Sequence, residues 1–229
     1  MTSAVDPRAM SRAKAIFYAI GSPLTLIALV FLPAGRIDWT PGWIFIAALV
    51  VSALLLARAN PMIYRARSRF QPGTKKWDLM LLAVLFPAFI SEIPLAALDG
   101  GRMEWSDVPL WVVLIGYVLL IGGIAVTAWA EAVDPFFEPG VRVQKERAQR
   151  VITSGPYRFV RHPGYSAAIA MFIGIPLALA SWWALLPAAL AVALLVLRTG
   201  LEDDLLQAEL PGYADYVCRT HYRLVPRLW

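Results

Sequence analysis

The stretch GYSAAIAMFIGIPLALASWWALLPAALAVALLVL, Gly164–Leu197, decides the fold of this chain. It is too long for one membrane-spanning helix of about 20 residues and short for two. Ser181-Trp182-Trp183 lies at its middle, between Pro176 and Pro187. Trp is enriched at membrane interfaces. We therefore predict a tight helical hairpin whose turn reaches the far interface of a membrane.

Four further apolar stretches precede this hairpin, and each is long enough to cross a bilayer. They run from about Ala15 to Pro33, Gly42 to Ala57, Leu79 to Leu98 and Leu110 to Ala130. The 229 residues are 59% hydrophobic and 16% charged, with a mean hydropathy of +0.61. Soluble domains have about 45–50% apolar and about 25% charged residues. The sequence thus predicts an all-α integral membrane protein of about six transmembrane helices, and excludes an ordinary soluble enzyme, a disordered chain and a nucleic-acid binder.

The basic residues predict the orientation of the chain. Nineteen of the 21 Lys and Arg residues lie in the N-terminal tail, in Arg58–Lys76, in Arg142–Arg161 and after Leu197, whereas Arg36 and Arg102 lie on the other side. The positive-inside rule then predicts a multi-pass protein with both termini and both long loops in the cytoplasm. This charge either serves the topology alone or also attracts anionic membrane lipids.

Cysteine and histidine are scarce, which limits metal chemistry. The one cysteine, Cys218, excludes an internal disulfide, and two histidines with one cysteine are too few for a typical zinc site of three or four ligands. We expect no metal. We also expect one integrated membrane domain, in which residues 1–131 form a four-helix part and residues 132–229 form the catalytic part.

Polar residues dense enough for chemistry occur in two segments, Asp134–Tyr165 and Arg198–Trp229, which flank the hairpin. A hairpin brings its two ends together, so we expect the segments to meet on the cytoplasmic side. In the first segment, Arg161–Tyr165 (RHPGY) forms a turn at the hairpin entrance, with a plain juxtamembrane anchor as an equal alternative. Asp134–Phe137 ends the preceding helix and either lines a pocket or only stops the helix.

The second segment offers a charged helical face. Arg198 and Glu202 are four residues apart, so they form either a simple ion pair or part of a pocket that holds a cation and an anion together. Leu205–Tyr216 continues with rough helical spacing, which predicts an amphipathic helix on the membrane. From the residues alone we infer a cytoplasm-facing pocket with His, Tyr, Arg and carboxylate groups, without a named reaction.

These motifs also resemble a known family. The run SGPYRFVRHPGY (154–165), the hydrophobic hairpin, R-x3-ED (198–203), LPGYADY (210–216) and RLVP (223–226) are similar to the isoprenylcysteine carboxyl methyltransferase family, which shares a superfamily with the phospholipid methyltransferases. The resemblance covers about Asp134–Trp229. Before that it extends only to a set of helices and to GTKKWD at Gly73–Asp78.

The resemblance implies methyl transfer from S-adenosylmethionine, which binds in a cytoplasmic pocket closed by the C-terminal segment, to a lipophilic acceptor that enters from the bilayer. It implies a cofactor site lined by Gln144, Gln149, Arg150, Val151, Ile152, Tyr157, Arg161, His162, Pro163, Gly164 and Tyr165. Glu202 or Asp203 completes that site, and Arg198 faces the acceptor. The family usually has paired glutamates where this chain has Glu202-Asp203, so both acids remain candidates for the cofactor.

The residue types suit this chemistry. A carboxylate such as Glu202 can hold the cofactor's ammonium, and Arg161 or main-chain amides near Gly155 can hold its carboxylate. Tyr157 and Tyr165 can pack on the adenine or face the sulfonium through a cation–π contact. Methyl transfer is an in-line displacement, so the protein supplies mainly positioning and a dry site.

The acceptor decides whether a base is needed. A carboxylate, most simply that of an isoprenylcysteine-like compound, is already ionised, so Arg198 binds it and His162 orients the cofactor. A phospholipid amine is the alternative, and Glu202 or His162 then becomes the candidate base. A NADPH-dependent membrane reductase of related fold is less favoured because such reductases are generally longer. A small transporter is disfavoured by the lack of a repeated half.

Two features within the apolar stretches stand apart from this pocket. Glu92 is an intramembrane acid, which makes a role in the acceptor cavity a hypothesis, although it can also lie near the outer interface or bond to a helix turn broken at Pro94. Gly116, Gly122 and Gly123 are candidates for packing contacts within the monomer.

Overall fold

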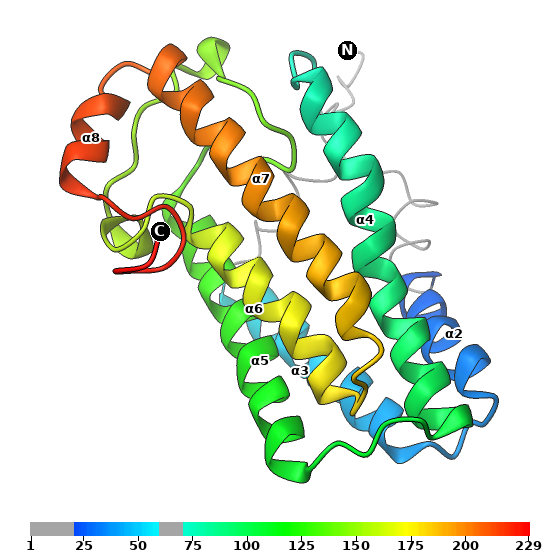
Figure 1. Ribbon diagram of the computed structural model, residues 1–229. Helices are drawn as coiled ribbons and strands as arrows, with labels where there is room; N and C mark the ends of the chain where they lie inside the picture. The colour runs from blue at the N-terminus through cyan, green and yellow to red at the C-terminus, as the bar shows by residue number, and fades with distance from the viewer. Residues whose placement is uncertain (1–20, 60–70) are drawn as a thin grey trace, which may run out of the picture.

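The protein is an all-helical bundle in the residues that its computed structural model describes, 21–59 and 71–229 (Figure 1). Residues 15–20 of the first predicted span lie outside the described residues. The α-helices are α2 (Ser22–Ala34), α3 (Thr40–Ala59), α4 (Lys76–Ala97), α5 (Leu110–Val133), α6 (Pro163–Ala178), α7 (Leu185–Glu209) and α8 (Tyr213–Arg219). A π-helical segment, Leu98–Met103, extends α4, and short 3-10 helices occur at Lys145–Arg147 and Gly155–Arg158.

Three of these helical segments are long and apolar enough to cross a membrane: Lys76–Met103, Leu110–Val133 and Leu185–Glu209. α2, α6 and the Thr40–Leu56 part of α3 are apolar but shorter. Large apolar side chains such as Leu54, Leu114 and Val118 are exposed, as expected for a surface that faces lipid. The all-helical membrane class is therefore confirmed, and the number of six spans stays a prediction.

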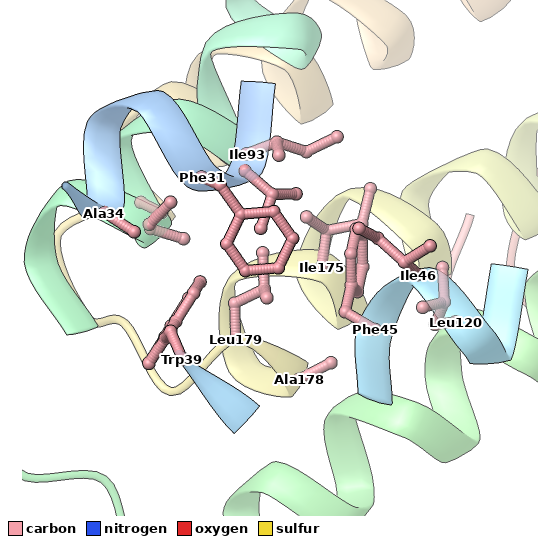
Figure 2. Packing of buried hydrophobic residues seen from close by; sticks show 14 residues of the cluster. Phe31, Ala34, Trp39, Phe45, Ile46, Ile93, Leu120, Ile175, Ala178 and Leu179 are labelled. Carbon is pink, nitrogen blue, oxygen red and sulfur yellow. The ribbon is translucent and has the colours of Figure 1, made fainter. Parts of the chain in front are cut away.

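The helices pack as neighbouring pairs (Figure 1). α5 packs along α6, and α7 contacts both α6 and α4. α2 packs against α4 near the end of the bundle that lies opposite α8. Figure 2 shows the largest buried cluster, in which Phe31, Phe45 and Ile175 bring together side chains from α2, α3 and α6, with Leu179 directly after α6.

Glycines set the distance between α5 and α6. A Cβ atom built on Gly116 would lie 2.3 Å from the backbone N of Ala178, and one on Gly123 would lie 2.7 Å from the backbone O of Ala167. Such contacts require glycine, because the two backbones already touch. A Cβ atom added to Gly122 would meet nothing within 4 Å. The expected intramolecular role thus holds for Gly116 and Gly123 but not for Gly122.

A buried acid holds the turn between α6 and α7. Asp99 is fully buried, and its carboxylate accepts hydrogen bonds from Ser181 Oγ (2.5 Å) and from Ser106 Oγ (2.6 Å) and N (3.0 Å). Trp182 and Trp183 project from this turn and are partly exposed. The turn is therefore fixed to the loop that leads into α5.

The C-terminal segment differs from the predicted amphipathic helix. α7 continues beyond Leu197 to Glu209, and the chain then turns at Pro211-Gly212, where Gly212 has a φ of 80°. Only glycine adopts this backbone conformation readily. α8 follows, and Tyr213 and Tyr216 are buried with Leu210 instead of lying on a membrane surface. The prediction of one surface helix over Leu205–Tyr216 was wrong because this break redirects the chain inward.

Candidate functional site

A cavity of about 200 Å³ lies at the end of the bundle that carries α8. Its walls come from the loops between α5 and α6, the start of α6, the last turns of α7, and α8. The two polar segments singled out in the sequence therefore meet in space. The predicted residues that line it are Gln144, Gln149, Arg150, Val151, Ile152, Tyr157, Arg161, His162, Pro163, Gly164, Tyr165, Arg198 and Glu202.

The wall that follows α5 is ordered by Asp134. Its Oδ1 accepts a hydrogen bond from the backbone N–H of Phe136 (2.8 Å), and its Oδ2 accepts one from the Tyr157 hydroxyl (3.1 Å). α5 ends at Val133, and Asp134 and Phe137 both line the cavity. The segment therefore stops the helix and also forms part of the cavity wall.

The loop beyond this wall is built around two glutamines. The Gln144 side chain is buried and donates to the carbonyl of Phe136 (2.5 Å), while Gln149 Oε1 accepts from the backbone N–H of Gln144 (2.7 Å). Arg147 Nη1 donates to Gln144 Oε1 (2.6 Å). These bonds hold the loop in a closed curve against the cavity, with Val151 packed on the cluster of Leu210, Tyr213 and Tyr216.

Asp203 lies outside the cavity and organises the elements around it. It is fully buried, and it accepts bonds from Arg161 Nε and Nη2 (both 2.8 Å) and from Arg223 Nε (2.9 Å). The Tyr213 hydroxyl donates to it at 2.9 Å, and His162 Nε2 lies 3.2 Å away. Asp203 thus joins α6, α7, α8 and the C-terminal segment, whereas its neighbour Glu202 lines the cavity.

The C-terminal segment is paired with the entrance of α6. The backbone N–H groups of Arg161 and His162 donate to the carbonyls of Tyr222 and Arg223, both at 2.9 Å. Ser166 Oγ donates to the carbonyl of Leu224 at 2.6 Å. These bonds fix the turn that carries the cavity-lining residues, so the C-terminal segment shapes the cavity.

The charged residues at the α7 side of the cavity are held separately. The Tyr165 hydroxyl donates a short hydrogen bond to Glu202. Arg198 donates to Asp78 through Nε (2.6 Å) and Nη2 (3.2 Å), and its guanidinium carbon lies 5.1 Å from the centre of the Tyr165 ring. The simple ion pair between Arg198 and Glu202 that their spacing allows is therefore not formed. Asp78 was not selected from the sequence, although it ends the GTKKWD run noticed there.

Burial keeps the tyrosines near the cavity protonated. It raises the pKa of Tyr157 far above its usual value, with the Asp134 carboxylate as a second cause. Burial likewise raises the pKa of Tyr213, helped by Asp203, and that of Tyr216 to about 12. Burial disfavours the Arg161 cation, but its hydrogen bonds to Asp203 outweigh this and raise its pKa. The phenols therefore act as hydrogen-bond donors at neutral pH.

Two other candidates lie away from the cavity. His221 is exposed. Glu92 is fully buried in α4, does not line the cavity, and has no hydrogen-bond partner for either carboxylate oxygen within the described residues. The hydrogen bond from Glu92 to the helix turn at Pro94, which the sequence allowed, is therefore not formed. In residues 21–59 and 71–229, no group of three or more His, Cys, Asp or Glu side chains is placed to hold a metal ion.

Comparison with known proteins finds one matching family. The sequence model of one family, described as phospholipid methyltransferase, matches residues 111–209, which run from the start of α5 to the end of α7. No curated protein matches the chain. The match includes the Arg161–Tyr165 turn, Arg198 and Glu202. The superfamily suspected from the sequence is confirmed for this part of the chain: residues 111–209 match a phospholipid methyltransferase domain, of the family shared with the isoprenylcysteine carboxyl methyltransferases, and the match supports a membrane methyltransferase in general.

Proposed function

We propose that the protein transfers a methyl group from S-adenosylmethionine to the carboxylate of an isoprenylcysteine-like compound. The observation that carries this proposal is the cavity, whose lining combines Glu202, Arg198 and two tyrosines, all within the matched residues 111–209. The acceptor would enter from the bilayer beside the apolar helices. The C-terminal segment, which is paired with the entrance of α6, would close the cofactor pocket.

The residues of the cavity fit the groups of S-adenosylmethionine. When bound, it supplies a methyl group carried on a sulfonium. Glu202 offers a carboxylate for the ammonium, and Tyr157 and Tyr165 offer aromatic faces for the adenine or the sulfonium. Arg150 is an exposed cation that lines the cavity, and we expect it to bind the cofactor's carboxylate. Arg161 suits this task less, because its guanidinium is bound to Asp203 and to the carbonyls of Thr220 and His221.

Arg198 is placed to orient an anionic acceptor. Its Nε and Nη2 atoms are bonded to Asp78, and Nη2 also donates to the carbonyl of Pro139 at 2.7 Å. Among the described residues, no hydrogen bond engages its Nη1 atom. That nitrogen can donate to a carboxylate oxygen of the acceptor. An ionised carboxylate needs no base, so positioning and the exclusion of water are the protein's contribution.

A phospholipid amine is the second candidate, favoured by the description of the matching family. An amine must lose a proton, and we expect Glu202 to accept it. His162 is less suited because its Nε2 atom faces Asp203 at 3.2 Å and the Tyr213 hydroxyl at 3.4 Å. His162 would then hold the turn in place and not move a proton.

Calorimetric binding of S-adenosylhomocysteine to the detergent-purified protein tests the cofactor assignment. We expect micromolar binding, with Tyr165→Ala and Glu202→Gln weakening it at least about tenfold, equivalent to about 1.4 kcal/mol. Glu209→Gln is the matched control, because Glu209 lies in the same helix but pairs with Lys75 outside the cavity. Folded protein that ignores S-adenosylhomocysteine would contradict the proposal, and binding of NADPH alone would favour the reductase.

Methylation assays then separate the two acceptors. Purified protein is given S-adenosylmethionine labelled on its methyl group, with either N-acetyl-S-farnesylcysteine or phosphatidylethanolamine vesicles. A base-labile methyl ester on the farnesylcysteine supports the carboxylate acceptor. Label on the phospholipid amine, with none on the farnesylcysteine, supports the second candidate.

A further inference from the structure

Asp78 is the least expected residue beside the cavity. It lies in the first turn of α4, outside the matched domain, and is fully buried. Its Oδ1 accepts from Arg198 Nε at 2.6 Å, and its Oδ2 accepts from Arg198 Nη2 at 3.2 Å and from the backbone N–H of Val141 at 2.7 Å. One carboxylate therefore joins α4, α7 and the cavity-lining loop, across 120 positions of sequence.

The bidentate geometry fixes the direction of Arg198. The guanidinium is planar and presents its donors in a rigid fork, so two bonds to one carboxylate determine its plane. The bond from Nη2 to the carbonyl of Pro139 adds a third constraint. Arg198 lines the cavity, whereas Asp78 does not. Asp78 therefore acts on the cavity through Arg198.

The same bonds decide what happens to Glu202. Residues four apart in a helix are neighbours, so Arg198 and Glu202 would pair if no other acid were within reach of the guanidinium. Asp78 prevents this pairing. A buried guanidinium that is left without a carboxylate is strongly destabilising, and Asp78 already supplies one, so a further bond to Glu202 would add little stability. Glu202 instead accepts the Tyr165 hydroxyl, and its Oε1 has no hydrogen-bond partner in the part of the chain described here.

We propose that Asp78 is a positioning residue that holds Arg198 away from Glu202, so that the cavity keeps a separate anion for the cofactor and a separate cation for the acceptor. This inference rests on the proposed function and deepens it. The group that Arg198 Nη1 would bind is an anionic oxygen, which the carboxylate of an isoprenylcysteine and the phosphate of a phospholipid both offer.

The proposal predicts an unusual pattern of binding. In Asp78→Asn, Arg198 turns to Glu202 and neutralises it, so the Kd for S-adenosylhomocysteine rises about tenfold, the worth of one charge-assisted hydrogen bond. Adding Arg198→Gln removes the competing cation, so the double variant regains binding to within about twofold of Arg198→Gln alone. Methyl transfer to either acceptor stays low in both, because the cation for the anionic oxygen is misplaced or gone.

Two comparisons separate positioning from a general effect on folding. Lys75→Gln breaks the exposed pair of Lys75 with Glu209, which also connects the start of α4 to the end of α7, and it should leave the Kd and the methylation KM unchanged. Asp78→Glu keeps the charge and should recover part of the binding that Asp78→Asn loses. The proposal would be overturned if S-adenosylhomocysteine binding were weakened equally in Asp78→Asn and in the double variant. It would also be overturned if Asp78→Asn left the Kd unchanged.

A measurement without ligand keeps this inference distinct from the proposed function. When Asp78 is present, the changes in unfolding midpoint caused by Arg198→Gln and Glu202→Gln should depart only slightly from additivity in the double variant, because the two residues do not pair and share only the side chain of Tyr165. They should become non-additive in the Asp78→Asn background, where the pair forms. Failure of the wild-type protein to bind S-adenosylhomocysteine would overturn the proposed function alone. Additivity both with Asp78 and in the Asp78→Asn background would overturn the role of Asp78.

Discussion

Two adjacent acids illustrate how much a single position matters. Glu202 and Asp203 follow one another in α7, and the resemblance made both candidates for the cofactor. Their side chains point to different environments: Glu202 lines the cavity, and Asp203 is sealed behind it with Arg161, Arg223 and Tyr213. Only their positions on the helix, about 100° apart, separate the two roles.

Substituting the two acids should therefore give opposite results. Asp203→Asn leaves two arginines around a neutral group in a buried site, and we expect a loss of about 3–5 kcal/mol in stability. Glu202→Gln should leave the unfolding midpoint nearly unchanged while weakening S-adenosylhomocysteine binding. Thermal unfolding and calorimetry on the same preparations measure both. A stable Asp203→Asn protein with selectively lost ligand binding would reverse this assignment.

At the scale of the elements, the contact of α5 with α6 depends on the absence of side chains. Gly116 and Gly123 on α5 meet the backbone of α6, and Gly174 on α6 meets the backbone N of Leu120. Without a hydrophobic driving force between helices in lipid, such close packing is a main source of association. α6 also carries the turn at the cavity, so this contact sets the position of the site.

Replacing Gly116 by alanine should push α5 and α6 apart. The new methyl group would sit 2.3 Å from the backbone N of Ala178, and neither backbone can yield. Overpacking of this kind costs about 1–3 kcal/mol. Gly122→Ala is the matched control, with open space around it and a gain in helix propensity. In detergent, Gly116→Ala should unfold at a lower temperature than Gly122→Ala. Equal unfolding midpoints would refute the role of Gly116.

At the scale of the whole molecule, hydropathy predicted the most. Length and apolarity located α4 and α5 closely, and the Trp pair marked the turn between α6 and α7, because these signals depend on local composition. The break at Pro211-Gly212 was underestimated, since helical spacing continues through it. The bond between Asp78 and Arg198 joins residues 120 apart, and nothing in either local sequence reports on the other.

The orientation of the protein in the membrane can be tested by labelling its single cysteine. Cys218 is the one cysteine of the chain, and it is exposed in α8 at the cavity end. The distribution of Lys and Arg predicts that this end is cytoplasmic. A membrane-impermeant maleimide should therefore label Cys218 only after intact cells are permeabilised. Cys218→Ser combined with Asp107→Cys moves the thiol to the exposed loop at the other end, and labelling of intact cells should follow. The reverse pattern would invert the topology.

The glycine contact between α5 and α6 also constrains how this protein can diverge. A position where two backbones touch has no room for any larger side chain, so its substitution needs compensating changes along both helices at once. Gly122 has no such restriction, nor do the lipid-facing positions beside it. Related proteins should therefore vary at Gly122 and at the lipid-facing positions, while Gly116 and Gly123 remain glycine.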